Sequence, residues 1–246
     1  MFGIVAAAVS TVASFIGSVG SAIVNIGSSI ASAVTSIAPM LAKFATPIIE
    51  GAKNLIAQFP KLDLEQIKVI IETALKIIHV IVDVLGLNKH KMSQEEIGER
   101  ALQHPEIKPE DYDREKDHLD ALHAAKYEPG KRPEGVSPDA WKAMCCAVGA
   151  GLEVKAISEE MMMATPLKVF LDCAKAGLSA KDIVDGQGGG VLEKMRDNGV
   201  KDATELSHYL GAESCGEPME AAMKGFVAPE TGLTGAQMVT RYASDK

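Results

Sequence analysis

The chain has 246 residues and a formal net charge of −8, with 47% hydrophobic and 4% aromatic residues. This length and apolar content suffice for one or two hydrophobic cores. The excess of negative charge lies entirely in the residues after Leu87. Because an acidic surface repels phosphate, we expect no direct nucleic-acid partner.

The first 42 residues contain no charged side chain. Large apolar residues recur in this stretch at steps of three and four, which is the spacing of a coiled-coil seam. The seam consists of Val5, Val9, Val12, Ile16, Val19, Ile23, Ile26, Ile30, Val34, Ile37 and Leu41. Mostly Ala, Gly, Ser and Thr surround it, so neighbouring helices could approach closely, in lipid or in a protein assembly.

The same stretch fits neither a simple membrane span nor a signal peptide. A helix over residues 3–38 would be roughly 54 Å long, against ~30 Å for a bilayer core. No basic residue precedes the apolar run, so we expect cytoplasmic synthesis without a cleavable signal peptide. The pattern therefore predicts an apolar helical region for assembly or membrane contact, in which part of the stretch spans a membrane, the stretch folds back on itself, or it forms one long packed helix.

A second helix is expected over residues 64–85, capped by Asp63 and Gln66 and ended by Gly86. Its polar side chains form one narrow line, and the rest of its circumference is apolar, with Ile71 and Ile78 as assembly positions. We expect the apolar face to pack on the N-terminal seam, with interfacial membrane insertion as the alternative. The polar line is Glu65, Lys68, Glu72, Lys76, His79 and Asp83.

Residues 88–135 are charge-rich and punctuated by proline, which indicates a connector with short helices. Ser93 with Glu96 predicts a helix to about Gln103, and Lys108-Pro109-Glu110-Asp111 predicts the start of another that carries Leu119 and Leu122. Four histidines gather here without metal-ligand spacing, so a pH-sensitive or metal-binding patch is the weaker interpretation. They are His90, His104, His118 and His123.

Residues 136–246 predict an acidic domain of short helices. Gly151, Gly177, Gly199 and Gly232 are expected to end helices. The pairs Ser179 with Asp182, Asp202 with Glu205, and Thr234 with Gln237 are expected to begin the next ones.

Three further patterns in this half favour structural roles. The GQGGG run at residues 186–190 lacks a preceding strand and a following Gly-Lys-Ser/Thr, so we interpret it as a helix–helix turn rather than a phosphate loop. Trp141 is expected to anchor a core, and the three methionines 161–163 to divide between core and edge. Without metal-ligand spacing, the four cysteines are expected to be reduced structural thiols.

At class level, residues 1–42 resemble the Gly/Ala/Ser-rich hydrophobic segments of phage tail-lumen, tape-measure and pilot proteins, and of pore-forming translocators. The resemblance implies storage in a virion or other delivery particle and engagement of a membrane on release. It carries no family site residues to this chain.

These observations predict an all-α protein with three parts: a hydrophobic assembly or membrane-interacting region (1–87), a charged connector (88–135) and an acidic helical domain (136–246). We find no motif for catalysis and expect a non-enzymatic protein of a phage tail or injection apparatus, without cofactor, metal or small-molecule substrate. Expected partners are further copies of itself, other assembly proteins and a membrane. The alternative is a soluble homo-oligomeric structural or adaptor protein assembled through the N-terminal helix.

Overall fold

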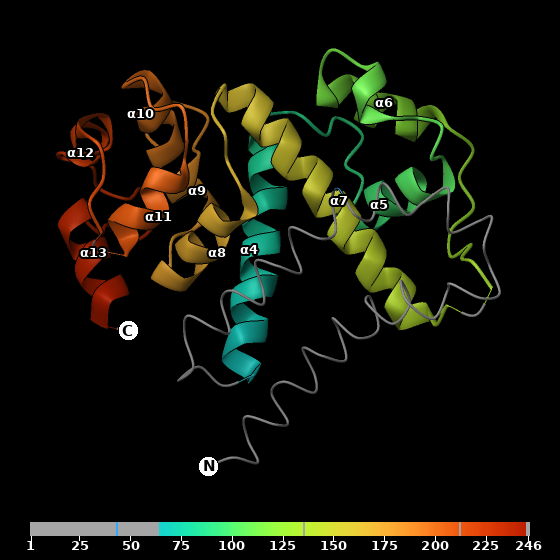
Figure 1. Cartoon of the computed structure of the whole chain (residues 1–246), viewed down its shortest axis with the longest axis horizontal. Helices are drawn as coiled ribbons and strands as arrows, with labels where there is room; N and C mark the ends of the chain where they lie inside the picture. The colour runs from blue at the N-terminus through green and yellow to red at the C-terminus, as the bar shows by residue number, and fades with distance from the viewer. Residues whose placement is uncertain (1–42, 44–63, 135, 212, 245–246) are drawn as a thin grey trace. The chain divides into compact units, whose positions relative to one another are not determined.

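The computed structural model describes residues 43, 64–134, 136–211 and 213–244 (Figure 1). Within these ranges the chain is all-helical, as predicted, with ten α-helices, one 3₁₀ helix and no strand. In chain order they are α4 (Leu64–Val84), α5 (Gln94–Gln103), η2 (Pro109–Asp111), α6 (Glu115–Ala124), α7 (Pro138–Met161), α8 (Leu167–Ala176), α9 (Ala180–Ile183), α10 (Val191–Asp197), α11 (Thr204–Leu210), α12 (Glu217–Met223) and α13 (Gly235–Ser244). The predicted N-terminal helix lies outside the described residues.

The contacts divide the described chain into two compact units. The first includes residues 90–152, and the second includes residues 69–89 and 153–244. Helix α7 contributes its first part to one unit and its second part to the other. The predicted boundaries at residues 87 and 135 stay a prediction, because most of the first predicted part lies outside the described residues.

Helix α4 has the amphipathic character that its sequence predicts. Ile78 is fully buried, Ile71 is half-buried, and Glu72 and Lys76 are exposed. The exposed side also includes an apolar residue, Val69, which is 57% exposed. The solvent-facing side of α4 is therefore less purely polar than the predicted line.

Gly86 ends α4 as predicted. Its φ of +66° is the left-handed conformation that glycine adopts without strain. The amide of Gly86 donates to the carbonyl of Asp83 at 3.1 Å, and that of Leu87 donates to the carbonyl of Val82 at 3.0 Å. This is the Schellman pattern, which satisfies carbonyl groups at the end of a helix.

Two glycines bring α5 and the first part of α7 into close contact in the first unit. A Cβ atom added at Gly98 would lie 1.8 Å from the carbonyl oxygen of Cys145, and one added at Gly149 would lie 1.9 Å from that of Gln94. The helix backbones can approach this closely only because neither glycine carries a side chain. Buried Leu119 and Leu122 of α6, which contacts α5, add to the apolar core.

Three predicted helix boundaries are wrong. Gly232 does not end a helix, because α12 already ends at Met223 and α13 begins at Gly235. The helix that carries Leu119 and Leu122 begins at Glu115, because Tyr112 and Arg114 are extended and separate it from the short turn η2. Gly151 lies inside α7 and does not end a helix. This helix continues to Met161, where Met162 takes the left-handed conformation with a φ of +52°.

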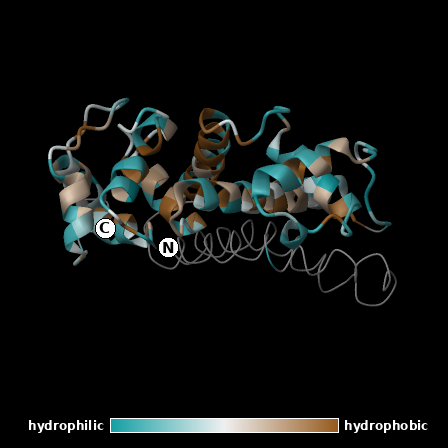
Figure 2. Cartoon of the chain, turned by 90° about the horizontal axis from the view of Figure 1, so that it is seen from above, coloured by the Kyte–Doolittle hydropathy of each residue, from teal (hydrophilic) through white to brown (hydrophobic). Residues whose placement is uncertain are grey.

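The second unit packs short helices around α8 and α11. Figure 1 shows α8, α11 and α13 side by side, and each contacts the other two. Phe170 of α8 and Phe226, which follows α12, are among the largest fully buried side chains. In Figure 2 hydrophobic and hydrophilic residues occupy different faces of individual helices, as expected where only one face is buried.

Predicted capping residues begin two helices of this unit. Ser179 and Asp182 form a reciprocal capping box before α9. Thr234 and Gln237 do the same before α13, with backbone-to-side-chain distances of 2.8 and 3.3 Å. The predicted pair of Asp202 with Glu205 is wrong, because Ala203 is the N-cap of α11. Asp202 accepts instead from the amide of Thr204 at 2.8 Å, and Glu205 accepts from the amide of Gly216 at 3.1 Å. Two isolated bridges, Ala164 with Asp202 and Val227 with Thr234, connect loops.

None of the helices in the described part of the chain is both long and apolar enough to cross a membrane.

Candidate functional site: a cavity beside helix α5

A cavity of about 470 Å³ opens at the C-terminal end of α5, within the first unit. Its lining combines apolar side chains with charged ones. The lining residues are Leu102, Gln103, His104, Pro105, Glu106, Lys126, Glu128, Lys131, Arg132, Pro133 and Trp141. Such a mixed lining is typical of small-ligand sites, in which apolar walls hold a few placed polar groups.

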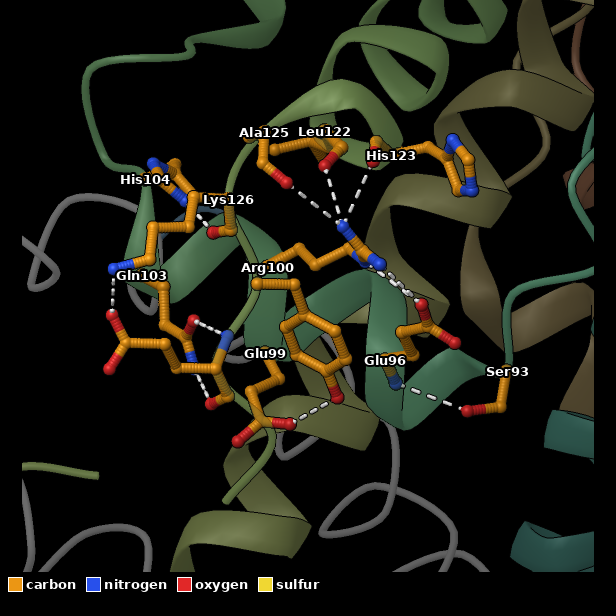
Figure 3. A network of polar contacts seen from close by, with 12 residues as sticks. Ser93, Glu96, Glu99, Arg100, Gln103, His104, Leu122, His123, Ala125 and Lys126 are labelled. Carbon is orange, nitrogen blue, oxygen red and sulfur yellow. Dashed lines mark hydrogen bonds and ion pairs between the residues drawn. The ribbon is translucent and has the colours of Figure 1, made fainter. Parts of the chain in front are cut away.

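Buried Arg100 fixes the chain that follows α6 against α5 (Figure 3). Its Nη1 donates to the carbonyl groups of Leu122, His123 and Ala125 at 3.0–3.3 Å. Glu96, one turn earlier on α5, holds the guanidinium at 2.8–2.9 Å. Because these carbonyls lie at the end of a helix, where intrahelical donors are lacking, Arg100 also acts as a C-cap for α6.

Glu99 fixes the next part of the cavity wall. This carboxylate is 5% exposed and accepts hydrogen bonds from the Tyr127 hydroxyl at 2.7 Å, the Gly130 amide at 2.8 Å and the Trp141 indole at 3.1 Å. Burial, together with the Glu99 carboxylate, raises the pKa of Tyr127, so the phenol keeps its proton. A buried carboxylate with three donors is a structural group, because burying it without them would be costly.

Gln103 and His104 hold the loop that contains Lys126 and Glu128. The Gln103 amide donates to the Glu128 carbonyl at 2.8 Å and accepts from the Glu128 amide at 3.2 Å. His104 places Nε2 at 2.6 Å from the Lys126 carbonyl and Nδ1 at 2.9 Å from a Glu106 oxygen. The hydrogen bond to the Lys126 carbonyl raises the pKa of His104, although burial opposes it, and Glu106 raises it further.

The rim of the cavity carries three basic and two acidic side chains. Glu128 lies 3.1 Å from the ammonium groups of both Lys126 and Lys131, whose hydrogen bonds lower the pKa of Glu128. Arg132 donates through Nε to the carbonyl of Val136 at 2.9 Å. The site thus presents two ammonium groups, one guanidinium and the carboxylates of Glu106 and Glu128 around an apolar floor that includes Trp141.

The four histidines of this region do not form one cluster. The rings of His90 and His123 are stacked with centroids 3.6 Å apart. His118 is fully buried, with Nδ1 at 2.5 Å from Glu115 and Nε2 at 3.1 Å from the Ile107 carbonyl. Across the described ranges, no three His, Cys, Asp or Glu side chains are placed to hold a metal ion.

The GQGGG run forms a turn between α9 and α10, and the protein's own carboxylate occupies it. Glu193, which is 4% exposed, accepts from the amides of Asp185, Gly186, Gly188 and Gly190 at 3.0–3.3 Å. Backbone amides that converge in this way form an anion-binding nest. Since Glu193 already supplies the anion, the geometry agrees with the turn that the sequence predicts.

Other sequence predictions have mixed outcomes. Trp141 is 6% exposed and anchors the core as expected, and the methionine run divides, with Met162 71% exposed between two buried neighbours. All four cysteines are free thiols. His79 belongs to the predicted polar line of α4. Its Nδ1 lies 2.6 Å from a carboxylate oxygen of Glu153, whose side chain is fully buried.

The predicted assembly residues and the cavity lie in different parts of the chain. All eleven seam residues between Val5 and Leu41 fall outside the described residues. The cavity arises largely from 88–135, which the sequence presents as a connector. The basic pair Lys131-Arg132, which lies between turn residues in EPGKRPEG, is the local sequence feature that could have indicated a binding site. Nothing in this run shows that α5 and Trp141 complete a cavity beside it.

We found no family model, curated protein or solved structure that matches the chain.

Proposed function

We propose that this chain is a non-enzymatic membrane-interacting or particle-associated protein, a component or cargo of a phage tail or contractile injection apparatus. The observation that carries the proposal is the uncharged N-terminal stretch with its regular apolar seam from Val5 to Leu41. An apolar stripe of that length needs lipid or protein to cover it, because exposing it to water costs about 25 cal/mol per Å².

The helical body supports a structural or binding role. Its buried carboxylates Glu99, Asp182 and Glu193 each accept hydrogen bonds from several loop amides or side chains. These carboxylates fix loops against helices. Their low exposure and their filled hydrogen-bond acceptors indicate a structural role. In this account the body carries the N-terminal segment and presents the surface for partner proteins.

Liposome flotation tests the proposal. The full-length chain should float with zwitterionic vesicles, whereas a variant lacking residues 1–42 should remain in the dense fractions. If the full-length chain also remains there, and the deletion changes neither its distribution nor its assembly state, the membrane proposal is wrong.

The second candidate is a soluble homo-oligomeric structural or adaptor protein. The three-and-four spacing of the seam favours it, because this spacing is typical of helices that associate side by side. Mass photometry without detergent separates the two candidates. The adaptor function requires a defined oligomer that is lost when residues 1–42 are removed.

A further inference from the structure

We propose that the cavity beside α5 binds a small organic anion, in which a carboxylate or phosphate group is attached to a compact apolar body. All lining residues lie between Leu102 and Trp141, and the proposal does not rest on the membrane or particle function.

Local charge favours an anion in this cavity. The lining carries Lys126, Lys131 and Arg132 against the carboxylates of Glu106 and Glu128, and His104 adds positive charge when it is protonated. The whole chain has a net charge of −8, so this positive excess opposes the general trend of the protein. With three cationic and two anionic side chains, the lining has a net charge of +1, which favours an anionic over a cationic ligand.

Arg132 supplies the most specific contact. Its Nε is engaged by the Val136 carbonyl at 2.9 Å, which limits the orientations of the guanidinium plane. Among the described residues its two terminal nitrogens form no hydrogen bond or ion pair. A guanidinium of this kind binds carboxylate or phosphate oxygens in a two-pronged manner.

The two lysines line the same cavity as Arg132. Lys126 and Lys131 both contact Glu128 at 3.1 Å, and their side chains are 82% and 63% exposed. Exposed ion pairs of this kind contribute little stability, so an incoming anion can share or replace Glu128 at low cost. The lysines then neutralise the ligand without movement of the backbone.

The floor of the cavity suits the apolar part of the ligand. Leu102 and Trp141 line it and are nearly buried, while Pro105 and Pro133 complete the apolar lining. The volume of about 470 Å³ lies within the range of small-molecule sites, roughly 300–1,000 Å³. The Glu99 carboxylate is not a lining residue, and its three internal donors offset its charge.

The single tryptophan of the chain provides a direct readout, because Trp141 lines the cavity. Full-length protein is titrated with 3-iodobenzoate, whose heavy atom quenches indole fluorescence on contact, and in parallel with neutral 3-iodobenzamide. We expect saturable quenching by the benzoate and weak, linear quenching by the amide. Phenyl phosphate should reverse the benzoate quenching by competition, whereas inorganic phosphate alone should do so weakly.

Two variants and one control locate the site. Arg132→Gln and Lys131→Gln should each weaken the benzoate interaction about ten-fold, as expected for loss of a charge-assisted contact. Lys131 makes no backbone hydrogen bond through its side chain, so K131Q stays informative if R132Q alters the loop. The control Lys201→Gln removes an exposed lysine of the second unit and should leave binding unchanged.

The proposal is overturned if the benzoate and the amide quench alike, or if quenching never saturates. It is equally overturned if R132Q and K131Q both bind 3-iodobenzoate as tightly as the K201Q control.

Discussion

Gly98 of α5 lies so close to Cys145 of α7 that a Cβ atom on the glycine would stand 1.8 Å from the Cys145 carbonyl oxygen. The obstructing atom belongs to the backbone of a helix, so it cannot turn aside as a flexible side chain would. Gly98→Ala should therefore force the two helices apart and lower the free energy of unfolding by about 3 kcal/mol or more, measured by chemical denaturation.

A matched glycine substitution controls for backbone strain. Gly199 has a φ of +82° and open space around the Cβ position, so Gly199→Ala should cost only about 1–2 kcal/mol. Equal effects of the two substitutions would contradict close contact between α5 and α7.

Substitutions on α4 should follow burial. Ile78 is fully buried, Ile71 is half-buried and Lys76 is exposed. Ile78→Asp should lower stability by about 4 kcal/mol or more, because it buries a charge, and Ile71→Asp should have a smaller effect. Lys76→Ala should change stability by less than about 0.5 kcal/mol.

Thermal melting checks this order. Comparable losses for Lys76→Ala and Ile78→Asp would indicate that the charged line of α4 is itself a binding surface, contrary to the burial pattern.

The Glu193 carboxylate should be essential to the turn before α10. It accepts from four backbone amides, including those of Gly186 and Gly190. Glu193→Gln keeps the shape but replaces one acceptor oxygen by an amide donor that faces other donors. We expect a loss of about 2 kcal/mol in chemical denaturation.

Glu134→Gln serves as the control, because Glu134 is exposed and its loss should be nearly silent. If E193Q is as stable as E134Q, the turn does not depend on an internal anion.

The pH dependence of stability should report on His104. Its pKa is raised in the folded protein, so its contribution to stability is fully present below the unfolded value of about 6.5. The contribution is lost as the pH rises through the folded-state pKa. The stability difference between the wild-type protein and His104→Asn should therefore be larger at pH 5.5 than at pH 8.5.

Titration of the His104 ring by NMR provides the direct check. A midpoint below 6.5, or a stability difference that grows with rising pH, would contradict the hydrogen bonds assigned to this ring.

The features that the sequence predicts well are local ones. Ser93 caps α5, the Thr234–Gln237 pair caps α13, and Gly86 ends α4, and each involves groups within about five positions of one another. Such contacts depend on residue type and spacing, which are visible in the sequence.

The candidate cavity depends on contacts between distant residues. Glu99 binds Trp141 across 42 positions and Gly130 across 31. In the sequence Glu99 is one charge in a charge-rich segment, and its burial follows from donors that only the fold brings near. The same reason explains why residues 88–135 suggest a connector although they build most of a cavity wall.

The proposed role of the N-terminal seam is tested most directly by placing one charge on it and one beside it. Ile26→Asp puts a carboxylate on the seam, whereas Ser28→Asp puts the same charge about 200° away around a helix. The measurement is the fraction of full-length protein that floats with zwitterionic liposomes. We expect the wild-type protein and S28D to float and I26D to remain in the dense fractions. Equal flotation of I26D and S28D, or no flotation of the wild-type protein, would contradict a membrane-contacting seam.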